Sequence, residues 1–176
     1  MLKNLKMIQE ELEYTDKIVS DLQDFTKPLN PRLKEVAIEE IFQDTLSNID
    51  IPKTIQVSHS VEKDFPKLMT DYTYMKRILT NLVLNAVQAM PDGGKLTLKA
   101  FRKENHVIIT VEDTGVGIPE EVKHRLFQPL FTTKSKGQGF GLPVCQRLTE
   151  ALKGTITFES QAGKGANFTI KLPAAK

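Results

Sequence analysis

The sequence is poor in the residues that build disulfides, zinc sites and haem sites. It has one cysteine, Cys145, no tryptophan and three histidines among 176 residues. A single cysteine cannot form an internal disulfide, which favours a reducing compartment. The histidines are scattered, and none of the spacings typical of a zinc or haem site occurs. The sequence therefore excludes an internally disulfide-linked fold and gives no sign of a transition-metal centre.

The sequence also lacks long apolar runs and an excess of charge of either sign. No segment approaches the length of a membrane span, and no signal peptide is recognisable. We therefore expect a cytoplasmic protein with no membrane segment in this chain, although a longer parent could be membrane-anchored upstream. The net charge is only +2, and no basic stripe is visible, so no nucleic-acid partner is expected. With 40% hydrophobic residues, the chain can bury one core and carry an additional arm.

Two asparagines one helical turn apart are the first positive feature. Apolar residues recur at spacings of three and four between Asp71 and Met90, which predicts an amphipathic helix over residues 71–90. Asn81 and Asn85 lie on one face of that helix. Asparagine is a mediocre helix former, so the pair needs a reason, and amide oxygens can hold Mg²⁺ together with the phosphates of a substrate. Taken alone, the pair is more simply two polar residues on a solvated face.

A short apolar run followed by a turn with an acid and two glycines is the second feature. Residues 107–111 (VIITV) predict a buried strand that delivers Asp113 to the rim of a pocket. An ionised carboxylate only accepts hydrogen bonds, so it suits a ligand group that donates, such as the exocyclic amine of adenine. Gly115 and Gly117 would let the backbone approach such a ligand closely or adopt a positive φ, where a Cβ would collide. Taken alone, this segment is a plain turn before the next helix, which Pro119 introduces.

A segment rich in glycine near residues 132–141 is the third feature. Its backbone N–H groups can form an anion-binding concavity, and Lys134 could add a point charge for phosphate. The helix that follows would direct its N-terminal amides toward the same anion. Phe127 and Phe131 are expected to anchor this segment rather than to contact a ligand. The alternative is that Lys134 and Lys136 are solvated loop charges.

Together, the three features resemble the ATP-binding catalytic domain of two-component sensor histidine kinases, which belong to the GHKL group of ATPases and kinases. NLVLNAVQAMPDGG resembles the N box of that family, DTGVGIP its first glycine box, FQPLFTTK its F box and GQGFGLPV its second glycine box. The resemblance extends from about Pro31 to Pro173. It implies that Gly139 and Gly141 both permit loop conformations that change with the nucleotide.

The resemblance also implies roles for individual residues. Asn85 is expected to coordinate Mg²⁺ with the assistance of Asn81, and Asp113 to hold the adenine amine of ATP. Residues 132–141 are expected to form a lid over the nucleotide, and Thr169 to lie near the adenine. The implied nucleotide-binding set is Asn81, Asn85, Asp113, Gly115, Gly117, Ile118, Thr132, Thr133, Lys134, Gly137, Gly139, Phe140, Gly141, Leu142 and Thr169.

One position separates the branches of the GHKL group. Its hydrolytic members usually carry a glutamate one turn before the metal-binding asparagine, where the carboxylate activates water. This chain has Asn81 there, and an amide cannot take a proton at neutral pH. The sequence therefore favours phosphoryl transfer from ATP over hydrolysis.

The first residues resemble a different part of the same family. Apolar residues step by three and four from Leu5 to Leu22, and the segment resembles the second helix of the dimerisation domain. We expect residues 1–27 to be part of that helix, residues 28–31 a linker and residues 32–176 the ATP-binding catalytic domain.

The family places its phosphoacceptor histidine on the first dimerisation helix, and no such helix is recognisable here. His59, His106 and His124 fall in the catalytic region and are most simply strand-edge or turn residues. The chain is therefore expected to be a catalytic fragment that is inactive in isolation. Its expected partners are a histidine-bearing dimerisation helix, a second copy in a homodimeric parent, and a response regulator protein.

Two other functions remain open on the sequence. The chain could be an interaction module whose lid is ordered by ATP and read by a partner, with no transfer. It could also be a serine kinase of the anti-sigma type, although such a kinase would not need the N-terminal arm.

The predicted fold class is α+β. We expect a two-layer α/β sandwich of the GHKL type, with a mixed, mostly antiparallel sheet, helices on one face and a long preceding N-terminal helix. Helices are expected near residues 2–26, 38–49, 71–90, 120–127 and 143–152. Strands are expected near residues 54–61, 95–103, 106–112, 154–160 and 166–172.

Overall fold

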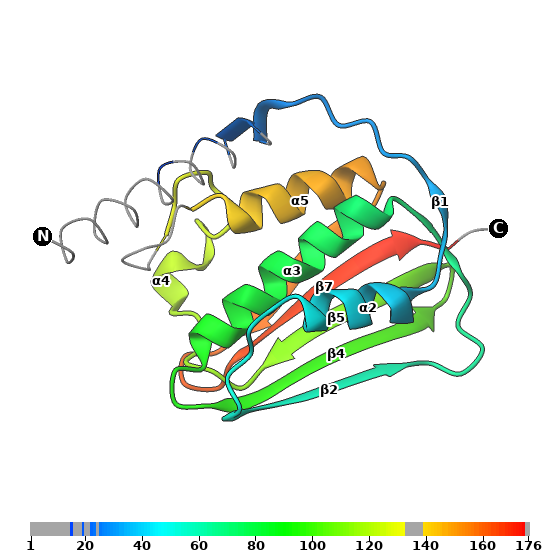
Figure 1. The fold of residues 1–176 in the computed structure, drawn as a ribbon. Coiled ribbons are helices and arrows are strands. Elements are labelled where there is room, and N and C mark those ends of the chain that lie inside the picture. The colour runs from blue at the N-terminus through cyan, green and yellow to red at the C-terminus, as the bar shows by residue number, and fades with distance from the viewer. Residues whose placement is uncertain (1–14, 16–18, 20–21, 24, 133–138, 175–176) are drawn as a thin grey trace, which may run out of the picture.

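The fold is an α/β sandwich built on a five-stranded mixed sheet (Figure 1). The computed structural model describes residues 15, 19, 22–23, 25–132 and 139–174. The strands are β1 (Lys34–Val36), β2 (Ile55–Val61), β3 (Leu68–Thr70), β4 (Gly94–Lys103), β5 (His106–Asp113), β6 (Thr155–Ser160) and β7 (Ala166–Pro173). The helices are α2 (Ile38–Ser47), α3 (Tyr72–Ala89), α4 (Glu120–Lys123) and α5 (Gly141–Ala151).

The main sheet has the strand order β2-β4-β5-β7-β6. Strands β2 and β4 are parallel, whereas the other neighbouring pairs are antiparallel. A second, two-stranded sheet pairs β1 with β3. Helices α2, α3 and α5 cover one face of the main sheet (Figure 1). The predicted α+β sandwich with a mixed, mostly antiparallel sheet is therefore confirmed.

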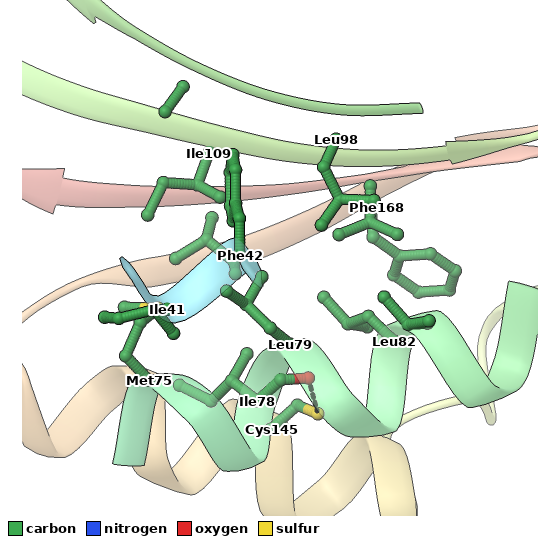
Figure 2. Close-up of a cluster of buried hydrophobic side chains, with 14 of the residues drawn as sticks. Ile41, Phe42, Met75, Ile78, Leu79, Leu82, Leu98, Ile109, Cys145 and Phe168 are labelled. Carbon is green, nitrogen blue, oxygen red and sulfur yellow. Dashed lines mark hydrogen bonds between the residues drawn. The ribbon is translucent and has the colours of Figure 1, made fainter. Parts of the chain in front are cut away.

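The core lies between the helices and one face of the sheet. Side chains alternate along β7, where Phe168, Ile170 and Leu172 are buried and the residues between them are not. The register sets Ile170 opposite Ile109 of β5, so one continuous apolar surface faces the helices. Figure 2 shows how α2 and α3 fill this surface with their own apolar side chains. Each such side chain contributes about 1.5–3 kcal/mol through burial.

Helix α3 is the central element of the helical layer. Its N-cap, Asp71, accepts a hydrogen bond from the Tyr74 backbone N–H at 3.1 Å and another from the Arg32 N–H at 2.7 Å. Capping fixes where the helix starts, and therefore which residues face the core and which face α5. This fixed start makes α3 a rigid support for the two asparagines.

Several predicted boundaries need correction. The strands β1 and β3 were not predicted, because three residues are too few to show a period. The helix expected at 120–127 ends at Lys123 and continues as turns, in which the Arg125 N–H bonds to the Val122 carbonyl at 3.0 Å. The helix expected at 143–152 starts two residues earlier, at Gly141.

Most of the long N-terminal helix expected over residues 2–26 lies outside the described residues. Those that the structure describes before Lys27 are Thr15, Val19, Leu22, Gln23, Phe25 and Thr26, and all six are helical. In the part of the chain that the structure describes, no helix is both long enough and apolar enough to cross a membrane.

Candidate functional site

The two asparagines lie on the side of α3 that meets the start of α5. Both are partly buried. The Asn81 Nδ2 atom donates to the Gly141 carbonyl oxygen at 3.5 Å, so the first turn of α5 lies directly against this part of α3. Asn85 follows one turn later. The structure therefore brings the N box and the second glycine box together, although 60 residues separate Asn81 from Gly141 along the chain.

Asp113 ends β5 and is only 5% exposed. Its Oδ1 atom accepts a hydrogen bond from the Gly115 backbone N–H at 2.8 Å. Its register partner on β7 is Ala166, the first residue of that strand. An ionised carboxylate only accepts hydrogen bonds, so a ligand group that contacts Asp113 would have to be a donor.

The loop after Asp113 is held by the protein itself. The Val116 N–H donates to the Ala89 carbonyl at the end of α3 (2.9 Å), and the Ile118 N–H donates to the Ser160 hydroxyl on β6 (2.9 Å). Gly117 has a φ of +67°, and a Cβ there would lie 2.1 Å from the Gln161 carbonyl oxygen. The sequence allowed Gly117 either a close approach to a ligand or a positive φ at which a Cβ would collide. The structure shows the second, and the space beside Gly117 belongs to the β6–β7 turn.

The F box and the second glycine box are joined at their ends. The Leu130 N–H donates to the Gly139 carbonyl at 3.1 Å. Gly139 has a φ of +71°, and a Cβ there would lie 2.5 Å from the Leu130 carbonyl carbon. The backbone at these two positions is therefore in tight contact, which only glycine permits.

Of the two phenylalanines of the F box, Phe127 packs against the sheet, whereas the ring contact of Phe131 is with a neighbour in the same segment. The ring of Phe127 lies 6.0 Å from the ring of Phe158 on β6, and the Arg125 guanidinium lies 4.3 Å from the centre of the Phe131 ring. Thr132, the last described residue of this segment, is exposed. The predicted site residues Thr133, Lys134 and Gly137 lie outside the described residues.

Thr169 does not lie where the sequence prediction needs it. It pairs with Thr110 on β5, whereas Asp113 pairs with Ala166. Successive side chains of a strand point to opposite faces, so Thr169 points away from the face that holds Asp113. We therefore leave Thr169 out of the site. Ala166, which has no polar side chain to attract attention in the sequence, lies beside Asp113.

Three predicted site residues serve the core with their side chains. Phe140 is buried, at 3% exposure, and Ile118 and Leu142 pack against the main hydrophobic cluster. They can therefore reach a ligand only through their backbone or the edge of a side chain.

Ser160 is a site residue that the sequence did not reveal. Its hydroxyl accepts from the Ile118 N–H and donates to the Gly165 carbonyl at 2.7 Å, so it ties the first glycine box to the β6–β7 turn. No local pattern marks a serine at a strand end for this role, because Ile118 lies 42 residues away along the chain.

The end of the N-terminal arm contacts the second glycine box. The ring of Phe25 lies 5.9 Å from the ring of Phe140. The Arg147 guanidinium on α5 lies 4.8 Å from the centre of the Phe25 ring, and its Nη2 atom donates to the Lys27 carbonyl at 3.3 Å. The arm and the start of α5 are thus packed together.

The histidines stand apart from the site. His59 lies in the edge strand β2, with its ring 6.4 Å from the ring of Phe42, while His106 begins β5 and His124 follows α4. Among the described residues, no group of three or more His, Cys, Asp or Glu side chains could hold a metal ion. Any cation at this site would therefore depend on amide oxygens and on the ligand.

Known proteins are similar in sequence to this chain. Residues 70–176 match the family model described as histidine kinase-, DNA gyrase B-, and HSP90-like ATPase. Sporulation kinase C of Bacillus subtilis (strain 168) is 34% identical over 176 residues, which cover 95% of this chain and 40% of the relative. Sensor histidine kinase ZraS of Escherichia coli (strain K12) is 32% identical over 171 residues, which cover 96% of this chain and 37% of the relative. The chain thus spans well under half the length of these relatives.

Solved structures share its fold. The nucleotide-free catalytic domain of histidine kinase ThkA superposes with a TM-score of 0.72 at 29% identity, over 81% of this chain and 95% of that one. ThkA in complex with response regulator protein TrrA gives a TM-score of 0.81 at 26% identity, over 98% of this chain and 51% of that one. Full-length ShkA in complex with AMPPNP superposes with a TM-score of 0.87 at 24% identity, over 99% of this chain and 39% of that one.

Proposed function

The chain belongs to the family of histidine kinase-, DNA gyrase B- and HSP90-like ATPases, as an ATP-binding catalytic domain of the sensor histidine kinase type, and from this we propose that it binds Mg²⁺ and ATP and transfers the γ-phosphate to a histidine on a dimerisation helix. We propose that the acceptor is not one of the three histidines of this chain, since His59, His106 and His124 stand apart from the site. The observation that carries the proposal is the meeting of the Asn81 amide with the first turn of α5, which assembles two separate motifs at one place.

The donor set at α3 fits Mg²⁺. This cation prefers oxygen ligands, keeps several waters and is usually held by one or two protein groups together with substrate phosphates. The amide oxygens of Asn85 and Asn81 would supply the protein share, with Asn85 as the main ligand. When bound, the cation would neutralise the charge of the phosphates during transfer.

Asp113 is proposed to recognise the adenine. Its Oδ1 atom is already engaged by the Gly115 N–H, which fixes the carboxylate plane. A carboxylate held in this way accepts from the exocyclic amine of adenine and rejects a base that presents an acceptor there. The backbone of the first glycine box, at Gly115, Gly117 and Ile118, would line the same side of the base.

The phosphates are proposed to lie under residues 132–141, with Thr132, Thr133, Lys134, Gly137, Gly139, Phe140, Gly141 and Leu142 as the lid and its hinge. The Leu130–Gly139 hydrogen bond would close the base of this segment. Asn81 cannot accept a proton from water, so the site would not activate water to hydrolyse ATP. The bound ATP would instead be available for phosphoryl transfer.

The proposed partners follow from the relatives. Histidine kinase ThkA has been crystallised with a response regulator protein. We place residues 1–27 of this chain in the second dimerisation helix of a homodimeric parent, residues 28–31 in a linker and residues 32–176 in the catalytic domain. The parent would then pass its phosphate to a response regulator.

A second function is favoured by one contact. The ring of Phe25 contacts the ring of Phe140 in the second glycine box. Nucleotide binding at that box could therefore change the position of the arm. An ATP-gated interaction module could use that route without any phosphoryl transfer. The serine kinase of the anti-sigma type has no comparable support, because its site would not need the packed arm.

Phosphoryl transfer decides between the two functions. The 176-residue chain is mixed with Mg·ATP and a dimerisation domain that carries the histidine helix. We expect acid-labile, base-stable phosphate on that helix, and Asn85→Ala should abolish it. Nucleotide binding without any labelled histidine would favour the interaction module, and the absence of Mg·ATP binding would contradict both functions.

A further inference from the structure

An open cavity of about 190 Å³ lies at the end of the sheet opposite to Asp113. Its lining residues are His106, Lys153, Gly154, Thr155, Lys171 and Pro173. His106 begins β5 and Asp113 ends it. The strand has 8 residues, so at about 3.3 Å per residue its two ends are roughly 23 Å apart. The cavity is therefore separate from the proposed nucleotide site.

The strand register gathers four of the lining residues on the face of the sheet that is turned away from the helices. Lys171 lies between two buried residues of β7, so its side chain points to the opposite face. Thr155 of β6 is the register partner of Lys171. His106 of β5 is the partner of Pro173, which lies two residues further along β7 and therefore on the same face as Lys171.

The cavity is basic and has no compensating acid. Two lysines and a histidine line it, and no aspartate or glutamate is among the described lining residues. The ammonium groups of Lys153 and Lys171 form no ion pair within the described part of the chain. The His106 Nδ1 atom is buried and has no hydrogen-bond partner there, so the ring can meet a ligand only through Nε2. Cations gathered in this way repel one another, and a bound anion would offset that repulsion.

Lys153 stands where the backbone favours glycine. It directly follows Leu152, the C-cap of α5, and its φ is +60°. Helices usually place glycine or asparagine in this conformation, because a Cβ is strained there. A lysine at such a position indicates that its side chain has a role. A positive charge also complements the negative end of the helix dipole, so an experiment must separate the two roles.

The donors in the cavity favour a phosphate group over a carboxylate. Arginine presents the planar fork that matches a carboxylate, and no arginine is among the described lining residues. Lysine is a point charge that suits phosphate. The donors come from β5, β6, β7 and the end of α5, so they can approach the several oxygens of a tetrahedral anion from different elements.

We propose that the cavity lined by His106, Lys153 and Lys171 binds a phosphate group other than those of ATP. The group is carried either by a soluble molecule or by the headgroup of a lipid, and the chemistry of recognition is the same for both. Such a site does not depend on phosphoryl transfer by the chain.

NMR titration of the 176-residue chain with inorganic phosphate, at constant pH and ionic strength, tests the proposed site. The chain has three histidines, so His59→Gln and His124→Gln suffice to assign their ring signals. We expect the ring signals of His106 to shift in a saturable manner while those of His59 and His124 stay in place. Acetate at the same ionic strength should leave His106 unchanged.

Two cavity variants and a matched control measure the contribution of the lysines. Lys153→Gly and Lys171→Gln should each weaken phosphate binding by about two- to fivefold, the range of a partly exposed ion pair. Lys153→Gly should not lower the thermal midpoint, because glycine is unstrained at this φ. Lys63→Gln removes the same charge from an exposed turn after β2 and should leave phosphate binding unchanged.

Vesicles of phosphatidic acid, whose headgroup is a phosphate monoester, separate the two sources of the ligand. Sedimentation of the chain with these vesicles that Lys171→Gln reduces and Lys63→Gln does not would identify a lipid phosphate. A His106 shift in phosphate without such sedimentation would identify a soluble one.

Ring signals of His106 that do not move in phosphate would overturn the proposed site. Equal weakening by Lys63→Gln and by the cavity variants would also overturn it, because the effect would then come from net charge alone. Lys153→Gly with a lower thermal midpoint and unchanged phosphate binding would assign Lys153 to the helix dipole and remove it from the site. Phosphoryl transfer is measured separately, so the two proposals can fail independently.

Discussion

Asn85 and Asp113 belong to different elements and are expected to recognise opposite ends of the nucleotide. Asn85 lies on α3 with the proposed cation, and Asp113 ends β5 with the proposed adenine. Asn85→Ala should weaken the binding of Mg·ATP by about tenfold or more and leave the affinity for adenosine unchanged. Asp113→Asn should weaken both, by about 1–3 kcal/mol, because its new N–H₂ group can face the adenine amine.

Calorimetry measures the affinity of each variant for ATP and for adenosine. The amide oxygen that Asp113→Asn introduces can still accept from the Gly115 N–H, so the fold of this variant should be intact, and circular dichroism checks this. If Asn85→Ala reduced the two affinities by the same factor, the division of roles would be wrong.

The buried thiol of Cys145 should make stability depend on pH in the alkaline range. Burial raises its pKa from an ordinary 9.0 to about 12 in the folded chain. The raised pKa means that the neutral form stabilises the fold fully below pH 9, and that this contribution is lost as the pH rises from 9 toward 12. The slope is at most about 1.4 kcal/mol per pH unit for one group.

Urea unfolding at a series of pH values tests this prediction. The original chain should lose more stability between about pH 9 and 11 than Cys145→Ala, in which every other titrating group is retained. In the native chain the thiol should also resist thiol-specific reagents at about pH 8 and react once urea unfolds it. Identical pH profiles for the two chains would contradict the assignment.

At the scale of elements, the junction between residues 127–131 and α5 depends on one glycine. Gly139 has a positive φ, and its Cβ would collide with the Leu130 backbone. Gly139→Ala should therefore cost about 1–3 kcal/mol of stability and loosen the base of the lid. Gly141 does not have a positive φ, and a Cβ there would meet only the Asn81 Cγ atom, at 4.0 Å.

Gly141→Ala is thus the matched comparison, and it should be tolerated or should slightly stabilise α5, since alanine is the better helix former. The sequence interpretation gave both glycines the same role, and the structure separates them. The free energy of unfolding of each variant measures the difference. A larger loss from Gly141→Ala than from Gly139→Ala would contradict the steric argument.

For the whole molecule, the chain by itself should neither hydrolyse ATP at a useful rate nor label its own histidines. Asn81 stands where a water-activating carboxylate would be needed, and His59, His106 and His124 lie outside the site. Labelled ATP with the isolated chain should give no acid-labile phosphate and only background phosphate release. Asn85→Ala is the control, because release that persists in this variant comes from a contaminant. Turnover that disappears in Asn85→Ala would overturn the prediction.

The contact between the arm and α5 connects the two proposed parts of the chain. Phe25 is partly buried against Phe140 and Arg147. Phe25→Ala should remove a ring–ring contact and a cation–π contact, at a combined cost of about 1–3 kcal/mol. Thermal unfolding measures the loss, with Phe127→Ala, which removes a ring contact to β6, as a comparison. An unchanged midpoint for Phe25→Ala would mean that the arm is not held.

Local patterns in the sequence determined the elements and the order of the motifs. The 3.6-residue period placed Asn81 and Asn85 on one side of a helix, and the β-branched run placed Asp113 at the end of a strand. Both patterns extend over a few neighbouring residues, so the sequence alone reveals them. The predicted core helices and strands are confirmed within a few residues. The motifs were also specific enough for the family resemblance, which the comparisons confirm.

Only the tertiary structure decided which distant residues meet. The register of β7 against β5 set Ala166, and not Thr169, beside Asp113, because a change of one residue reverses the face of every side chain. The packing of α5 on α3 brought Gly141 to Asn81, and the β6–β7 turn occupied the space beside Gly117. These contacts join segments far apart in the chain, so their geometry follows from how the layers pack and not from any local sequence pattern.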